Sequence, residues 1–365
     1  MQIANRLLEL IKTPGRQLWI GNNPPFEMPL LDAENATGFR VSPALHQAWD
    51  TVWIYERFIS DYDSWKLLLD EALRLFKGKG ILVMRYKTNR YNFSNFGLKQ
   101  FLFRRPNIRV RMLWEDGVQT DSGFISTSVF EINRLELEAY RSSAWTLGLI
   151  TQGNKVSNVV QFCESVRAQD PEHRHEILIY GPPDPAFAPF NVRHIDMSGS
   201  AEEITLAMKK NTIADAASLP NLLVAHDRYV LDPGFFDAFS TWGYDFDLCA
   251  VTQRYENGRP YPAYCAMNGT GLVWNPPVHC ENLNLLHSTQ YVNGGLMVFK
   301  THSLRRLRFN DLLYWNQAED MELCHQFQEC GLPPRMNFMA SATTIGVAET
   351  HTAKFASDRT IGPFS

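Results

Sequence analysis

The chain has 365 residues, of which 45% are hydrophobic and 20% charged, and its formal net charge is -4 at pH 7. This length predicts two domains of ordinary size, and the weakly acidic balance excludes a globally basic nucleic-acid-binding protein. Residues 1–19 lack the apolar core of a signal peptide, and no apolar run is long enough to predict a transmembrane helix. The 6 cysteines form no CxxC pair, which favours reduced thiols and a cytoplasmic protein.

The first part of the chain alternates amphipathic segments with short apolar ones, which predicts an α/β domain. We expect helices at 2–12, 63–80 and 95–104, strands at 16–22, 51–58 and 81–87, and a hairpin of 108–117 with 123–134. Gly78 is expected to end the second helix as a C-cap. A polar stretch, residues 136–146, then separates this region from a second one.

Part of this first region resembles class I methyltransferases. The segment "LLLDEALRLFKGKGILVM" and the hairpin strand "GFISTSVFEINR" are similar to the late helix, strand and closing hairpin of that family. The family binds its cofactor with a Gly-rich turn after the first strand, where side chains would block close backbone approach. Here that position holds "IGNNPPFEM", with one glycine and two prolines. We therefore predict a degenerate, non-catalytic methyltransferase-like domain over residues 1–140.

The second part of the chain has the order of an open α/β sheet. Strands are expected at 146–154, 175–184, 192–197 and 221–231, with helices at 156–169 and 201–218 between them. Ligands of such sheets gather at the carboxyl ends of the strands. Polar residues stand at three of these ends, namely Thr151 with Gln152, the turn that closes with Asp184, and His226 with Asp227.

Two further motifs follow. Gly294 and Gly295 precede the apolar strand 296–300 and are expected to let the backbone approach a bound sugar. Glu319 and Asp320 open an amphipathic helix at 319–332. Taken alone, a His-Asp pair is most often a turn, and acids at a helix N-terminus are ordinary complements to the helix dipole. It is the ordered combination of these motifs that points to a function.

Residues 146–355 resemble the GT-A glycosyltransferases. The resemblance implies that Thr151, Gln152 and Asp184 hold the nucleotide, together with the "KKN" segment at Lys209, Lys210 and Asn211. The family ends a core strand in an Asp-x-Asp motif that binds a divalent metal on the donor's diphosphate. This chain has Ala225-His226-Asp227 instead, so the role of His226 stays open between metal ligand, phosphate donor and neighbour of the base.

The resemblance also implies a metal and a catalytic base. Asp227 offers the carboxylate oxygen that Mg²⁺ or Mn²⁺ prefers, and His351 follows an apolar strand as a third candidate ligand. The pattern "NGG" followed by "ED" is similar to the acceptor side of inverting members, where an acid is the base. That acid corresponds to Asp320, with Glu319 beside it, while Arg228 and Lys210 are candidate diphosphate partners.

The sequence therefore predicts two α/β domains: a Rossmann-like methyltransferase-like domain (1–140) and a GT-A domain with an open mixed sheet (145–365). The predicted activity is hexosyl transfer from a nucleotide-sugar to a saccharide or glycolipid acceptor in polysaccharide or O-antigen synthesis, metal-assisted and inverting. The alternatives are a retaining transferase on the same fold and a non-catalytic nucleotide-sugar-binding or scaffold protein. We expect a cytoplasmic location, with peripheral association at the inner membrane face left open, and no nucleic-acid partner.

Overall fold

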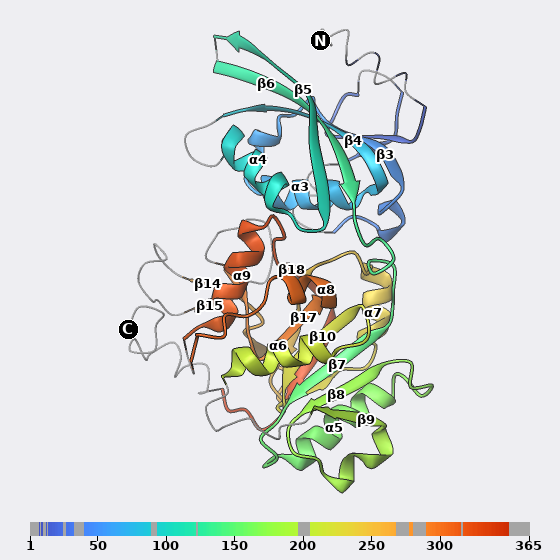
Figure 1. Cartoon of the computed structure of the whole chain (residues 1–365), viewed down its shortest axis with the longest axis vertical. Helices are drawn as coiled ribbons and strands as arrows, with labels where there is room; N and C mark the ends of the chain where they lie inside the picture. Colours follow the sequence, from blue (N-terminus) through green and yellow to red (C-terminus); the bar gives the residue numbers. More distant parts are fainter. Residues whose placement is uncertain are drawn as a thin grey trace. The chain divides into compact units, whose positions relative to one another are not determined.

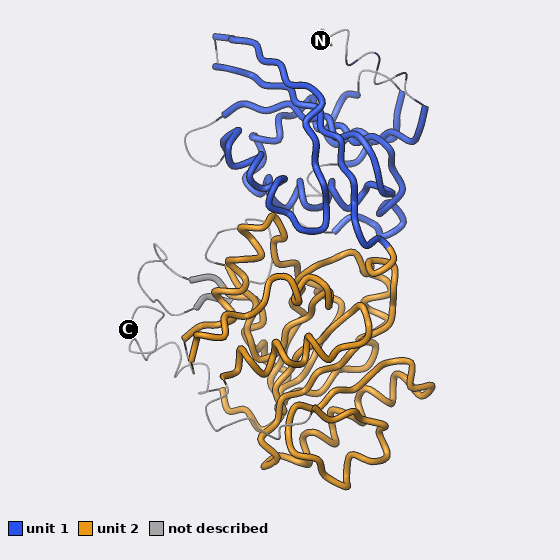
Figure 2. Tube along the Cα trace, viewed as in Figure 1, with its two compact units in different colours: residues 1–137, 284–286 blue, residues 138–283, 287–365 orange. Residues whose placement is uncertain are grey.

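The structure is a computed structural model of the whole chain. It describes residues 14–349 except 25–26, 33–39, 89–92, 122, 196–204, 268–276, 280–289 and 315–316, and also residues 7, 9 and 12. The chain divides into two compact units, one formed by residues 1–137 with 284–286 and the other by residues 138–283 with 287–365 (Figure 2). Each unit is described by itself. Among the described helices, none is both long and apolar enough to cross a bilayer.

Unit 1 contains a six-stranded sheet in the order β2-β1-β3-β4-β6-β5 (Figure 1). The strands are β1 (Gln17–Ile20), β2 (Leu30–Leu31), β3 (Trp49–Ile54), β4 (Phe76–Lys87), β5 (Ile108–Thr120) and β6 (Gly123–Arg134). β1 to β4 pair in parallel, whereas β6 runs antiparallel to both β4 and β5. The predicted hairpin is therefore confirmed as β5 and β6. Two short 3-10 turns, η1 (Pro43–Leu45) and η2 (Ile59–Asp61), lie in the connections.

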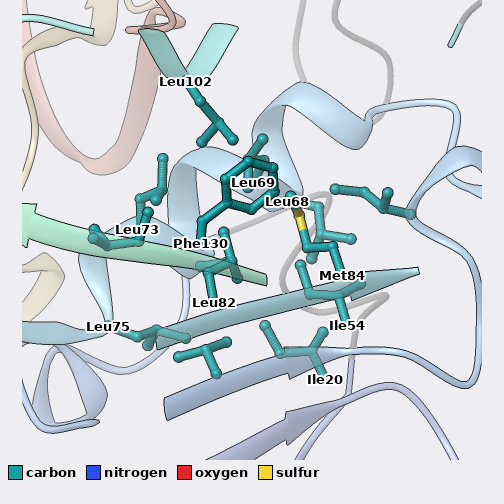
Figure 3. Packing of buried hydrophobic residues seen from close by; sticks show 14 of the residues in the cluster. Ile20, Ile54, Leu68, Leu69, Leu73, Leu75, Leu82, Met84, Leu102 and Phe130 are labelled. Atoms are coloured by element: carbon teal, nitrogen blue, oxygen red, sulfur yellow. The ribbon is translucent and has the colours of Figure 1, made fainter. Parts of the chain in front are cut away.

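The helices in the described part of unit 1 are α3 (Trp65–Arg74) and α4 (Asn95–Arg104), and their apolar sides cover one face of the sheet, while most of the helix predicted at 2–12 lies outside the described residues. Figure 3 shows Leu68, Leu69 and Leu73 of α3 packed against strand residues such as Leu82 and Phe130. Strand residues of opposite parity, among them Trp19 and Trp53, form a separate cluster. This alternation follows from the period-2 geometry of strands.

The prediction that Gly78 caps the second helix is wrong. The helix ends at Arg74, and Gly78 lies inside β4, which starts at Phe76. Phe76 pairs with Trp49 of β3 and is fully buried, while Lys79 pairs with Asn133 of β6. The ladders on both sides of β4 therefore extend this segment, which local glycine chemistry alone did not predict.

Unit 2 is built on a sheet in the order β11-β18-β12-β17-β10-β7-β8-β9, with β13 paired to β12. Its strands are β7 (Trp145–Ile150), β8 (Glu176–Tyr180), β9 (Val192–Ile195), β10 (Asn221–His226), β11 (Tyr229–Leu231), β12 (Leu248–Arg254), β13 (Pro260–Tyr261), β17 (Leu296–Lys300) and β18 (Arg335–Thr344). A small separate sheet holds β14 (Tyr264–Met267), β15 (Pro277–His279) and β16 (Gln290–Val292). The helices are α5 (Val156–Arg167), η3 (Pro185–Phe190), α6 (Leu206–Ala216), α7 (Phe235–Trp242), α8 (Thr301–Arg306) and α9 (Glu319–Glu329).

The large sheet of unit 2 is covered on both faces. Leu147 and Leu149 of β7 join a buried cluster with α5 and α7. On the opposite face, Gly148 lies so close to Ile213 of α6 that a Cβ would sit 2.3 Å from its Cγ2. Every residue of β7 is buried, as expected of a parallel strand between two helical layers. The predicted α/β class is thus confirmed.

Candidate active site

The polar strand ends of unit 2 meet at one edge of the sheet. β7, β8 and β10 are parallel, and Ile150 pairs with both Tyr180 and His226. The residues that follow these strands therefore lie side by side. β17 runs antiparallel to β10 with Leu296 opposite Ala225, so the glycine turn before β17 lies at the same edge.

Asp227 is held in place by residues of the β7–α5 connection. Its Oδ2 accepts a 2.8 Å hydrogen bond from the Thr151 hydroxyl, and its backbone oxygen accepts one from Asn158 Nδ2 at 3.0 Å. The Lys155 ammonium lies 3.8 Å from Oδ1 and is half exposed. Thr151, which is buried, thus orients the carboxylate. Neither Lys155 nor Asn158 was predicted from the sequence, although both follow a polar strand end.

His226 is uncharged at neutral pH. Burial lowers its pKa well below the ordinary value, and the nearby cations of Lys210, Arg228, Lys155 and Lys209 lower it further. Its Nε2 is buried and has no hydrogen-bond partner among the described residues. A neutral imidazole amid positive charge is suited to donate a hydrogen bond to an anionic oxygen.

Asp320 lies in the first turn of α9, behind Ala318, which has a φ of 58°. Its Oδ2 accepts a 2.7 Å hydrogen bond from the backbone N–H of Gly294, and its Oδ1 accepts one from Met321 at 2.9 Å. Burial and, to a smaller extent, the neighbouring charge of Glu319 raise the pKa of Asp320 to about 6. Asp320 therefore binds a proton near neutral pH far more tightly than an ordinary aspartate does.

Glu319, the other acid of the pair, pairs with a buried cation. The ammonium of Lys210 on α6 donates to Glu319 Oε1 at 2.9 Å and to the carbonyl oxygen of Gly294 at 2.9 Å. Burial alone would raise the pKa of Glu319, but the charge and hydrogen bond of Lys210 outweigh it, so the pKa is lowered. Neighbouring carboxylates driven to different proton affinities are a recurrent feature of catalytic sites.

Close packing requires both glycines of the turn before β17. A Cβ on Gly294 would lie 2.9 Å from Asp320 Cβ and 3.0 Å from Lys210 Nζ. A Cβ on Gly295 would lie 2.6 Å from the Tyr229 hydroxyl and 2.7 Å from Arg228 Nη2. The space beside both glycines is therefore occupied by the protein's own side chains.

The remaining predicted residues are placed as follows. Gln152 is exposed at the edge of the sheet. Asp184 accepts from the Ala186 N–H at 2.8 Å and so caps η3. Asn211 is buried and bonds to Phe309 and Asp311, which lie ahead of α9. His351 lies outside the described residues.

The two acids that were predicted to act together are linked by a short chain of contacts. The backbone N–H of His226, next to Asp227, donates to the carbonyl oxygen of Gly295 at 3.0 Å. Gly294, the preceding residue, donates to Asp320. The donor-side and acceptor-side candidates thus lie at the same edge of one sheet.

The residues at Asp227 fit a divalent cation in part. Its Oδ1 has the lone pairs to bind a hard cation, since its closest described partner is Lys155 at 3.8 Å. His226 fits less well, because four cations act on its imidazole and would oppose a bound metal ion there. Within the described part of the chain, no three His, Cys, Asp or Glu side chains are grouped to hold a metal.

Comparisons with known proteins found similarity to solved structures only. No family model matches the chain, and no curated protein matches its sequence. GalNAc-T7 with UDP, GalNAc and Mn²⁺ matches at 13% identity and a TM-score of 0.43, over 56% of this chain and 44% of that one. S. aureus TarS 1-349 matches at 12% identity and a TM-score of 0.38, over 59% of this chain and 69% of the other.

A mannosyltransferase from Pyrobaculum calidifontis, PcManGT in complex with GDP-Man and Mn²⁺, matches at 11% identity. Its TM-score is 0.39, and the match covers 57% of this chain and 59% of that one. This chain thus spans less than half of GalNAc-T7. At these scores the likenesses do not assign a family.

Proposed function

We propose that this chain is a GT-A glycosyltransferase that moves a sugar from a nucleotide-sugar donor to a hydroxyl of a saccharide acceptor. The observation that carries the proposal is Asp320, a carboxylate held by the Gly294 N–H with its pKa raised to about 6. A base of this strength is mostly ionised at neutral pH and accepts a proton better than an ordinary aspartate does.

The reaction proposed is a single displacement with inversion. The acceptor oxygen forms a bond to the anomeric carbon while its proton passes to Asp320. The bond from that carbon to the diphosphate oxygen breaks, and the nucleoside diphosphate leaves with the electron pair. A raised pKa suits Asp320 because it must bind the proton as the hydroxyl attacks and release it afterwards.

The donor side is proposed at Asp227. Lys155 and Arg228 lie near this strand end, where they would stabilise the charge that grows on the departing diphosphate. His226 is proposed as a neutral hydrogen-bond donor to the same group, since its Nε2 has no partner among the described residues. A Mn²⁺ or Mg²⁺ ion held by Asp227 would supply further positive charge to the diphosphate.

The test is a thermal-shift screen of nucleotide-sugars, with Mn²⁺ and with chelator, on the wild type and two variants. Specific binding raises the melting temperature by mass action. We expect Asp227→Ala to lose the shift and Asp320→Asn to retain it while losing transfer. If Asp320→Asn transfers sugar at the wild-type rate, Asp320 is not the base.

A retaining transferase on the same site is the alternative in which Asp320 orients the acceptor. A proton NMR time course of the product's anomeric configuration separates the two, because inversion and retention give opposite anomers. A non-catalytic sugar-nucleotide binder would show the thermal shift without transfer in the wild type.

For unit 1 we propose a methyltransferase-like domain that has lost its cofactor site. In support, β1 ends at Ile20 and is followed by a single glycine, Gly21, before Asn22 and Asn23. Titration of the full chain with S-adenosylmethionine tests this proposal, and saturable binding would contradict it.

A further inference from the structure

Lys210 is buried, with 1% of its surface exposed, and its hydrogen bonds go to the protein. Nζ donates to the carbonyl oxygen of Gly294 and to Glu319 Oε1, both at 2.9 Å, and lies 4.8 Å from the centre of the Phe309 ring. A cation enclosed in this way is poorly placed to meet a diphosphate that arrives from solvent. The sequence suggested that Lys210 is a diphosphate partner, but its buried position favours a role within the protein.

Lys210 joins the glycine turn to the acid pair. Gly294 accepts from Lys210 through its carbonyl oxygen and donates to Asp320 through its N–H. Glu319 is the residue that precedes Asp320 on α9, and it accepts the other hydrogen bond of Lys210. The ammonium thus fixes the turn that binds Asp320, and its positive charge balances the negative charge of the neighbouring Glu319.

We propose that Lys210 is a positioning residue that keeps Glu319 as the ionised member of the pair and holds Gly294 against Asp320, so that Asp320 is the proton acceptor. This inference rests on the proposed function for its catalytic meaning, but the electrostatic arrangement is testable without it. A buried ammonium that hydrogen-bonds one of two adjacent carboxyls stabilises the ionised form of that one most.

Among the described residues, further ionisable groups act on Asp320 or interact with Lys210. They are Cys324 on α9 itself, Tyr291 on β16, which acts on Asp320 from the small sheet, and His226 on β10, whose pKa Lys210 lowers. Burial raises the pKa of both Tyr291 and Cys324, so these two are neutral at pH 7. Lys210 is therefore the cation that decides how charge divides between Glu319 and Asp320 among these groups.

A matched control lies next to Lys210 on the same helix. Asn211 is equally buried, and its side chain donates to the Phe309 carbonyl and to Asp311 and accepts from the Phe309 N–H. It therefore anchors the start of the segment that leads to α9, whereas Lys210 anchors its end. Asn211→Ala removes an anchor of that segment without changing the charge beside Asp320.

The experiment follows the Asp320 carboxyl by ¹³C NMR in the full chain as pH is varied, with Asp320→Asn to assign the resonance. We expect Lys210→Met to raise the midpoint of the Asp320 titration by about one pH unit or more, because it loses an opposite charge. Glu319→Gln should lower the midpoint, because it removes a like charge. Lys210→Arg, which keeps the charge, should restore the midpoint toward the wild type, and Asn211→Ala should leave it near the wild-type value.

Transfer assays give a second readout. The pH midpoint of the acid limb of the kcat/KM profile should shift to higher pH in Lys210→Met and to lower pH in Glu319→Gln, as the NMR midpoints do. The proposal is overturned if Lys210→Met leaves the Asp320 midpoint unchanged, or if Asn211→Ala moves it as far. Absent transfer with the expected NMR midpoints would reject the glycosyltransferase assignment and retain the role of Lys210. If Lys210→Met does not fold, the opposite movement in Glu319→Gln still tests the arrangement.

Discussion

The backbone N–H of His226 donates to the carbonyl oxygen of Gly295 at 3.0 Å, across the antiparallel pairing of β10 and β17. This single contact brings the strand end that carries Asp227 to the turn that binds Asp320. It is a main-chain relationship, and it therefore depends on the register of two strands rather than on the identity of the histidine. Substitution of His226 should leave the turn in place.

Asp320→Asn should stabilise the protein at neutral pH. The folded-state pKa of Asp320 is about 6 against an ordinary value of 3.8, so its stabilising contribution is present below pH 3.8 and is lost as pH rises through 6. At pH 7 the variant should gain up to about 3 kcal/mol in the free energy of unfolding, with little gain at pH 4. Denaturant unfolding at both pH values measures this.

Glu319→Gln should change the free energy of unfolding at neutral pH in the opposite direction. Its pKa is lowered in the folded protein by Lys210, so Glu319 contributes stability above its unfolded pKa and loses it as pH falls. The variant should therefore be less stable than the wild type at pH 7. Both pKa assignments, raised for Asp320 and lowered for Glu319, would be contradicted if the stability of each variant changed with pH as that of the wild type does from pH 4 to pH 7.

Gly294→Ala should disturb the acid pair. The added methyl would lie 2.9 Å from Asp320 Cβ and 3.0 Å from Lys210 Nζ, and forced contacts of this kind cost about 1–3 kcal/mol. We expect lower stability together with a large loss of kcat. Gly148→Ala is the control, since its methyl would meet Ile213 of α6 at 2.3 Å. It should lower stability as well, while the pH dependence of transfer stays that of the wild type.

The sequence predicted β7, β8, β9, β10 and β17 of unit 2 because their apolar runs are bounded by polar ends, whereas β12, β13 and the small sheet were not predicted. The strand predicted at 221–231 is β10 (Asn221–His226) followed, after a turn, by the separate short strand β11 (Tyr229–Leu231), and the strand predicted at 296–300 is β17. The strand-end rule placed polar groups at one edge. The partners of the buried charged side chains could not be predicted from any local pattern in the sequence. Lys210 and Glu319 are 109 positions apart, and nothing local indicates that this lysine faces an acid rather than a phosphate.

Local chemistry misled the prediction where tertiary pairing decided the outcome. A glycine after an amphipathic segment is typical of a helix end, yet Gly78 lies within β4. This strand extends through Gly78 because it pairs with β3 on one side and β6 on the other. Gly294 was assigned to ligand approach, whereas Asp320 and Lys210 occupy the space beside it. In both cases the glycine was recognised as important, and only the packed neighbours show the reason.

Asp70→Ala should destabilise unit 1. Asp70 is fully buried on α3 and accepts from Arg74 at 2.9 Å and from Arg105 at 2.7 Å. Removing one partner of a buried ion pair leaves charge uncompensated, and such changes cost about 3–5 kcal/mol. Denaturant unfolding, followed by the fluorescence of the Trp19–Trp53 pair in unit 1, measures the loss. A change within experimental error would show that these arginines find other partners.

Thr151→Val tests whether Asp227 needs its orientation. The Thr151 hydroxyl donates to Asp227 Oδ2 at 2.8 Å, and a hydrogen bond to a charged group contributes about 1.5–3 kcal/mol. If the Asp227 carboxylate must face the donor, loss of this hydrogen bond should weaken nucleotide-sugar binding roughly tenfold or more. The midpoint of the Asp320 pH titration should stay unchanged. Calorimetric titration with the donor selected by thermal shift measures this loss.

Thr146→Val, near the other end of β7, supplies the matched control. Thr146 also donates to a carboxylate, Glu176 Oε2, at 2.7 Å, but Thr146 lies near the amino end of β7, away from the predicted site. Both substitutions remove one hydroxyl-to-carboxylate hydrogen bond from a buried residue, Thr146 within β7 and Thr151 just after its end, so both should lower stability by similar amounts. Only Thr151→Val should weaken donor binding. Equal weakening in both would mean that binding follows the stability of β7 as a whole and that Asp227 has no special orientation to protect.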